Sequence, residues 1–159
     1  MEENEIKKIA YEIFNPENMT FNKLLGFKID IDNLENPKVI MNMNKNLIGN
    51  HYYKILHGGA ISSILDTAGG LIALIGVLKK FKGTSYDELA EKLSKISTVD
   101  LRVDYLRPGK GEYFIATGNV IRTGNKVSVI RMELKNNKGE LISVGTGTYL
   151  VGWIYKNLK

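Results

Sequence analysis

Asp66 stands inside a long apolar segment, GGAISSILDTAGGLIALIGVL at positions 58–78. A carboxylate among apolar residues is costly to bury unless hydrogen-bond donors or a cation accompany it. Carboxylates in such surroundings are frequent in active sites, where they act as general bases or as nucleophiles. The alternative is a structural aspartate that caps a neighbouring loop, and the position of Asp66 alone does not separate these two interpretations.

The tripeptide His57-Gly58-Gly59 lies at the beginning of the same segment. The first backbone N–H groups of a helix have no partner within the helix, and the helix dipole gives them a positive potential. Because glycine lets a ligand approach closely, Gly58 is a candidate oxyanion donor for a carbonyl that becomes tetrahedral. The alternative is that the glycines only permit a sharp turn. We expect His57 to orient that turn by hydrogen bonds rather than to transfer a proton.

Gly58 and Asp66 are eight residues apart, which on one α-helix is about 12 Å along the axis. Groups that act on the same carbonyl must all lie within about 3 Å of it. One chain therefore cannot place both groups on one substrate. Two helices packed side by side across a two-fold axis can pair Gly58 of one chain with Asp66 of the other. The spacing predicts an obligate homodimer with two shared sites.

Three further polar residues could support such a site. Asn50 lies in a polar loop before the glycines and could hold a carbonyl or a water molecule. His51 beside it could do the same, or could simply be exposed to solvent. Thr98 begins a strictly alternating segment, where its hydroxyl could position a water or could serve only as an ordinary strand residue.

The hydrophobic pattern predicts the elements that must position these residues. Helical spacing covers 2–14 and a further turn near 21–25, and the apolar segment predicts a buried helix from about 59 to 80. A capping-box sequence at 85–88 predicts another helix ending near residue 95. Period-two alternation predicts six strands, at 27–31, 39–44, 98–106, 113–121, 126–134 and 141–151, with a polar loop after the second. Hairpin-length connections predict an antiparallel meander for the last strands.

An antiparallel sheet with one apolar face must be covered, and the uniformly apolar helix is the obvious cover. We therefore expect an α+β hotdog fold, in which an antiparallel β-sheet wraps around a long central α-helix. Without a repeat or linker, residues 1–159 are expected to form a single domain that includes the N-terminal helix. The apolar segment could span a bilayer by length. Asp66 would cost about 2.5–3.5 kcal/mol near the bilayer centre, so the buried helix is favoured.

The composition narrows the possible partners. The net charge is +5, but the lysines are scattered without a basic run, which argues against a nucleic-acid partner. The surplus of positive charge suits a polyanionic small molecule such as coenzyme A. The sequence has no cysteine, and its two histidines lack ligand spacing, so we expect no metal site. The N-terminus lacks the apolar core of a signal peptide, and we expect a cytoplasmic location.

Three segments occur in a recognisable order: ILHGGAISSILDTAGGLIAL, STVDLRVDYLRPGKGEYF and RTGNKVSVIRMEL. Together they closely resemble the hotdog thioesterases of the PaaI-like superfamily, and within it the YigI-like medium- and long-chain acyl-CoA thioesterases. The resemblance runs from about Phe21 to Gly152. It implies a hydrolase that releases free acid and coenzyme A from acyl-CoA without a cofactor of its own. We also expect the homodimers predicted from the helix spacing to pair into tetramers.

The resemblance assigns roles to single residues. Asp66 matches the catalytic carboxylate, which acts either as general base on water or as nucleophile. Gly58 matches the glycine whose N–H polarises the thioester carbonyl. His57 and Asn50 match polar residues that help to hold the carbonyl or the water. Thr98 falls where related enzymes place a Ser or Thr that positions the water.

Two assignments from the resemblance are less direct. Some relatives carry the loop asparagine one position nearer the glycines, which would select His51 in place of Asn50. The residues that fall where relatives contact the coenzyme A phosphates are Arg122, Asn125 and Lys126.

Two other functions remain open from the sequence. A hotdog hydratase or dehydratase of acyl thioesters uses a histidine and a carboxylate as its acid/base pair, which His57 and Asp66 could imitate. A non-catalytic acyl-CoA-binding hotdog protein would need the pocket but not the carboxylate. Release of free thiol from acyl-CoA distinguishes a thioesterase from both.

Overall fold

The computed structural model describes residues 2–80, 93 and 96–151. Its helices are α1 (Glu3–Phe14), α2 (Thr20–Leu25) and α3 (Gly58–Leu78), with one 3-10 turn, η1 (Lys45–Leu47). Its strands are β1 (Phe27–Asp30), β2 (Lys38–Asn42), β3 (Ile48–Asn50), β4 (Ile55–Leu56), β5 (Ser97–Tyr105), β6 (Tyr113–Thr123), β7 (Val127–Asn136) and β8 (Leu141–Leu150). The predicted helices and strands within this part of the chain are present, with ends shifted by a few residues. The helix predicted between 85 and 95 lies outside the described residues.

The six long strands form one antiparallel sheet in the order β1-β2-β6-β7-β8-β5. Strands β6, β7 and β8 are the predicted meander. The meander does not include β5, which lies beyond β8 at the edge of the sheet. The connection from β5 to β6 contains Pro108 and Gly109 and is too long for a tight hairpin, so β6 is free to pair with β2 instead.

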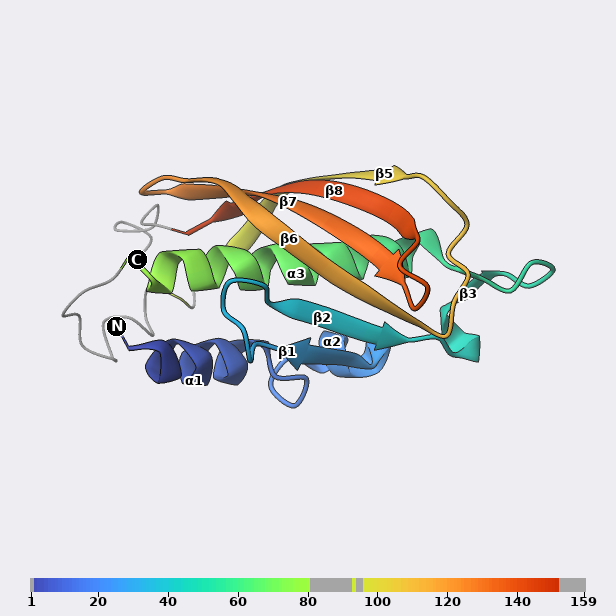
Figure 1. Ribbon diagram of the computed structural model, residues 1–159, viewed down its shortest axis with the longest axis horizontal. Coiled ribbons are helices and arrows are strands. Elements are labelled where there is room, and N and C mark those ends of the chain that lie inside the picture. The colour runs from blue at the N-terminus through green and yellow to red at the C-terminus, as the bar shows by residue number, and fades with distance from the viewer. Residues whose placement is uncertain (1, 81–92, 94–95, 152–159) are drawn as a thin grey trace, which may run out of the picture.

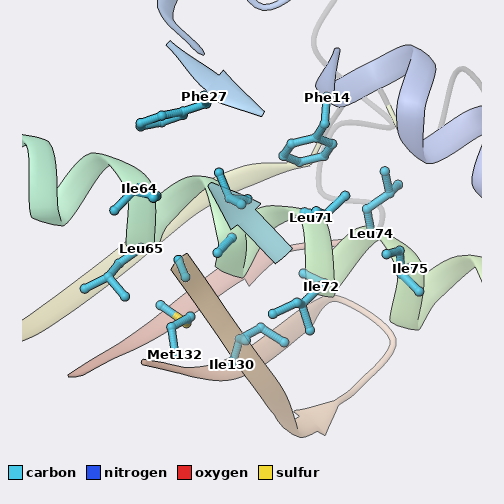
Figure 2. Close-up of a cluster of buried hydrophobic side chains, with 14 of the residues drawn as sticks. Phe14, Phe27, Ile64, Leu65, Leu71, Ile72, Leu74, Ile75, Ile130 and Met132 are labelled. Carbon is cyan, nitrogen blue, oxygen red and sulfur yellow. The ribbon is translucent and has the colours of Figure 1, made fainter. Parts of the chain in front are cut away.

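Helix α3 runs along the concave side of the curved sheet, and α1 lies on the other side of α3 (Figure 1). Figure 2 shows Leu65 and Ile72 of α3 directed toward Met132 and Ile130 of β7, while Phe14 of α1 approaches from the opposite side. All five side chains are buried. An apolar helix is stable here because most of its surface meets protein. The face that stays partly open carries Gly59, Ser62, Ser63, Asp66 and Thr67. A sheet wrapped around one long helix is the predicted hotdog fold.

By length and composition α3 could also cross a membrane. In this structure, 72% of its most apolar stretch is buried inside the protein. The sheet and α1 therefore cover the apolar surface that a bilayer would otherwise cover. The partly buried Asp66 is located on the face of α3 that approaches the beginning of β5.

The segment between β2 and α3 is more ordered than the predicted polar loop. It contains η1 and a short hairpin of β3 and β4. Buried Leu47 and Leu56 anchor the hairpin, and the His57 amide donates to the Leu47 carbonyl at 2.8 Å. These apolar anchors explain why the segment folds back on itself and delivers the chain to the first turn of α3 in a defined direction.

Candidate active site

His57 is the N-cap of α3, and its backbone is extended, with φ −65° and ψ 138°. Its Nδ1 accepts a hydrogen bond from the Gly59 amide at 2.8 Å. His57 therefore orients the turn, as predicted, and its side chain binds the Gly59 N–H, one of the helix N–H groups that lack a partner within the helix. Among the described residues, no acceptor binds the Gly58 amide. The Gly58 N–H is thus available to a ligand at the positive end of the helix dipole.

The phenol ring of Tyr105 covers one side of Gly58. Its hydroxyl donates to the Gly58 carbonyl oxygen at 3.1 Å. A cavity of about 350 Å³ opens beside this contact, and Leu56, Ile61, Tyr105 and Arg107 are among the residues that line it with Gly58. The walls are mainly apolar, with one cation at the rim. The cavity leads to the first turn of α3, and Asp66 is not part of its lining.

Asp66 lies near the middle of α3 and is half-buried. The hydroxyl of Thr98, at the beginning of β5, donates to its Oδ1 at 2.8 Å. The hydroxyl of Thr98 thus binds the carboxylate itself, and its role in positioning a water molecule stays a prediction. The hydrogen bond fixes one oxygen of Asp66, while a carboxylate retains further lone pairs for a substrate or a water.

Tyr149 is a neighbour of Asp66 that the sequence analysis did not single out. Its side chain is 1% exposed, and its hydroxyl donates to the main-chain carbonyl of Asp66 at 3.2 Å. Burial first, and then the Asp66 carboxylate, raise the pKa of Tyr149 well above its usual range. The alternating glycines at 145 and 147 were a possible signal, because glycine inside a strand often marks a close approach of another chain segment.

Gly58 and Asp66 are located in the first and third turns of the same helix, about 12 Å apart along its axis. Tyr105 and the cavity surround Gly58, whereas Thr98 and Tyr149 surround Asp66. The chain therefore carries two separate parts of a candidate site. One part offers a hydrogen-bond donor for a carbonyl oxygen, and the other offers a carboxylate.

The structure gives the loop residues Asn50 and His51 local contacts. Asn50 Oδ1 accepts from the amides of Tyr52 and Tyr53, at 3.0 and 3.2 Å. His51 is exposed, and its ring stacks on Tyr52 with centroids 4.0 Å apart. The side-chain oxygen of Asn50 thus holds the β3–β4 turn together. A role of either residue on a substrate stays a prediction.

The predicted coenzyme A contacts lie at the other end of α3 from Gly58 within one chain. Arg122, Asn125 and Lys126 are exposed at the β6–β7 hairpin. Lys80, just after α3, donates to the Thr123 carbonyl at 2.6 Å, which places this hairpin at the C-terminal end of the helix (Figure 1). Gly58 is at the opposite end. Contact of these residues with coenzyme A stays a prediction.

Within the described part of the chain, no group of three or more His, Asp and Glu side chains could hold a metal ion. The open Gly58 amide and the Asp66 carboxylate resemble sites that act through hydrogen bonds and one carboxylate. An unoccupied helix N-terminus can stabilise a developing oxyanion, and a carboxylate can activate water or attack a carbonyl.

A long central helix wrapped by an antiparallel sheet is the hotdog fold, and here the helix offers an open amide in its first turn and a carboxylate in its third. Residues 53–143 match the Thioesterase superfamily, and the chain belongs to that superfamily. It is 44% identical over 134 residues to the medium/long-chain acyl-CoA thioesterase YigI of Escherichia coli strain K12, covering 84% of this chain and 86% of the relative.

Solved structures agree with this assignment. A Shewanella oneidensis protein related to the thioesterase superfamily superposes with a TM-score of 0.89 at 45% identity, covering 94% of this chain and 97% of the other. The PaaI protein of the phenylacetic acid degradation operon of E. coli superposes with a TM-score of 0.70 at 20% identity, covering 93% and 94%. At this low identity the similarity to PaaI concerns the fold alone, and it confirms PaaI as a structural neighbour.

Proposed function

We propose that this protein hydrolyses medium- to long-chain acyl-CoA to free acid and coenzyme A. The observation that carries the proposal is that α3 presents two groups at separate positions: the open amide of Gly58 and the carboxylate of Asp66, which Thr98 holds by a hydrogen bond. The proposed reaction and substrate class also agree with the name of the YigI relative, a medium/long-chain acyl-CoA thioesterase that is 44% identical to this chain.

In the proposed reaction, the thioester carbonyl oxygen accepts a hydrogen bond from the Gly58 N–H, and this bond polarises the carbonyl group. Asp66 of the other subunit then either removes a proton from the attacking water or attacks the carbon itself. The carbon–sulfur bond breaks, and coenzyme A leaves as a thiolate, which takes a proton from Asp66 or from solvent. If Asp66 attacks the carbon itself, a water molecule then hydrolyses the acyl–Asp66 anhydride to the free acid and restores the carboxylate. A thiolate is a good leaving group, so the reaction needs little help from an acid. The apolar cavity beside Gly58 suits the acyl part of the substrate.

The shared site requires a dimer, and β5 is the element we propose for its interface. This nine-residue strand pairs with β8 along one side and is the last strand of the sheet. Its Val99 and Tyr105 are 61% and 55% exposed. A long edge strand with exposed apolar side chains is open to pairing with a second chain. Asp66 accepts a hydrogen bond from Thr98, the second residue of this strand, so a partner on β5 would approach Asp66.

Mixing two defective variants tests whether the site is shared. Gly58→Pro removes the proposed oxyanion donor, and Asp66→Asn removes the proposed base, so each homodimer should be inactive. In a dimer of one chain of each kind, one shared site carries both defects and the other carries none. Random mixing by co-expression should therefore restore about a quarter of the wild-type activity. No recovery in verified mixed dimers, or a wild-type monomer, would contradict the shared site.

The function itself is tested by thiol release from a series of acyl-CoA substrates of increasing chain length. We expect release that is fastest for medium or long chains. Hydration of crotonyl-CoA without release of thiol would instead indicate a hydratase. Binding of acyl-CoA with equal affinity in the wild type and Asp66→Ala, without turnover in either, would indicate a binding protein.

A further inference from the structure

Tyr149 has no role in the reaction described above, yet it contacts the proposed catalytic carboxylate residue. The side chain comes from the end of β8 and is 1% exposed. Its hydroxyl donates to the main-chain carbonyl of Asp66 at 3.2 Å. A helix carbonyl has a second lone pair beyond the one that the helix uses, so this bond adds to the helix without breaking it. Tyr149 therefore ties β8 to α3 at the residue that carries the carboxylate.

Two glycines make room for this contact. A Cβ atom at Gly147 would lie 2.6 Å from the Tyr149 hydroxyl oxygen. A Cβ atom at Gly69, three residues after Asp66 on α3, would collide with the same oxygen. Both Cβ atoms would also crowd the Cζ and Cε2 atoms of the ring, so the glycines make room for the ring together with its hydroxyl. The sequence thus accommodates the polar end of Tyr149 next to the helix backbone.

Tyr149 and Thr98 are also direct cross-strand partners in the β8–β5 register. Paired residues on neighbouring antiparallel strands project to the same face of the sheet. Here that face meets α3, where Thr98 binds the Asp66 carboxylate at 2.8 Å and Tyr149 binds the Asp66 backbone. One pair of residues in the sheet therefore holds Asp66 at two points, one on the side chain and one on the main chain.

The hydroxyl is suited to this task over the working pH range. Burial, together with the nearby carboxylate of Asp66, raises the pKa of Tyr149. The hydroxyl therefore stays protonated and remains a donor. A protonated and enclosed phenol does not act as a base or as a nucleophile.

We propose that Tyr149 is a positioning residue for Asp66, fixing α3 against β8 so that the carboxylate stays aligned with Thr98 and with the thioester. This proposal rests on the proposed thioesterase function. Small displacements of a reacting group lower the rate of the chemical step much more than they lower substrate binding. Loss of the hydroxyl should therefore reduce kcat and leave KM nearly unchanged.

The test is a double-mutant cycle of Tyr149→Phe and Thr98→Val in the full-length protein, with thiol release from acyl-CoA as the readout. The wild type is measured first, because absence of thiol release there would reject the proposed function rather than the role of Tyr149. We expect Tyr149→Phe to lower kcat about tenfold with KM within about twofold of the wild type. In the Thr98→Val background, where Asp66 is already released, the same change should lower kcat by less than about threefold.

Ile142→Val is the matched control, because Ile142 is buried in the same strand but lies at its other end. Its melting temperature should fall while kcat is unchanged, which separates general core damage from loss of alignment. The proposal is overturned if Tyr149→Phe retains the wild-type kcat. It is also overturned if its effect is equally large with and without Thr98, or if Ile142→Val lowers kcat to the same extent.

Discussion

The hydroxyl of Thr98 lies 2.8 Å from Oδ1 of Asp66 and joins the edge strand β5 to the central helix. This contact holds Asp66, the only carboxylate of α3, next to β5. Strand β5 is the strand at which we propose that a second chain pairs. It also leaves Asp66 half-exposed, so that the carboxylate can reach a substrate. The orientation of Asp66 thus depends on the sheet as well as on the helix.

Replacement of Thr98 by valine keeps the shape of the side chain and removes the hydrogen bond to Asp66. We expect kcat in the thiol-release assay to fall about tenfold, because the carboxylate becomes free to rotate. Thr98→Ser retains the donor and should keep most of the activity. A Thr98→Val enzyme with the wild-type kcat would show that this hydrogen bond is not needed.

Replacement of Gly58 by proline removes the amide hydrogen and puts a ring carbon in its place. Proline is favourable at the first position of a helix, and the extended backbone of His57 is the conformation that a following proline requires. We expect kcat to fall about 100- to 1,000-fold, the usual loss for one oxyanion donor. Gly58→Ala keeps the N–H, and its Cβ would lie 3.4 Å from the Tyr105 ring, so it should stay active. Equal activity of the two variants would remove Gly58 from the mechanism.

Two glycines of α3 should respond in opposite ways to alanine. At Gly69 the new methyl group would collide with Tyr149, and we expect a loss of about 1–3 kcal/mol in the free energy of unfolding. At Gly76 it would make ordinary contacts, 3.5 Å from Val120, so the gain in helix propensity of about 1 kcal/mol should dominate. Urea denaturation measures both. A stabilised Gly69→Ala variant would contradict the packing around Tyr149.

The raised pKa of Tyr149 predicts a loss of stability in alkaline solution. Below about pH 10 tyrosine is protonated in both the folded and the unfolded chain, and its contribution to stability is complete. Above this pH the unfolded chain releases the proton while the folded protein keeps it. The free energy of unfolding should then fall by up to about 1.4 kcal/mol per pH unit from this group. Tyr149→Phe should lack this part of the decline, and parallel curves for the two proteins between pH 9 and 11 would contradict the prediction.

The sequence was sufficient for the elements whose pattern reflects burial on their own faces. The apolar run around Asp66 predicted a central helix because most of its surface is covered, and strict alternation predicted the long strands. The spacing of Gly58 and Asp66 predicted that one chain separates them, since helix geometry alone determines this distance.

What the sequence did not predict depends on contacts between distant segments. The position of β5 beside β8 follows from strand pairing across the sheet, which alternation within β5 does not encode. Tyr149 looks like an ordinary strand residue until β8 is placed against α3. Thr98 was expected to hold a water, and only the structure shows that its hydroxyl reaches Asp66. The hydrogen bond from the Asn50 side-chain oxygen to the turn that follows it is likewise visible only in the structure.

The central claim is that Asp66 carries out thioester hydrolysis, and kcat of Asp66→Asn in the thiol-release assay tests it most directly. The amide is nearly the same size as the carboxylate but can neither take a proton from water nor attack the thioester carbon as a carboxylate does. We predict that kcat falls by at least about 1,000-fold while acyl-CoA still binds. The matched control Asp32→Asn, at an exposed loop position, should behave as the wild type. An Asp66→Asn enzyme with kcat within about tenfold of the wild type would contradict the mechanism.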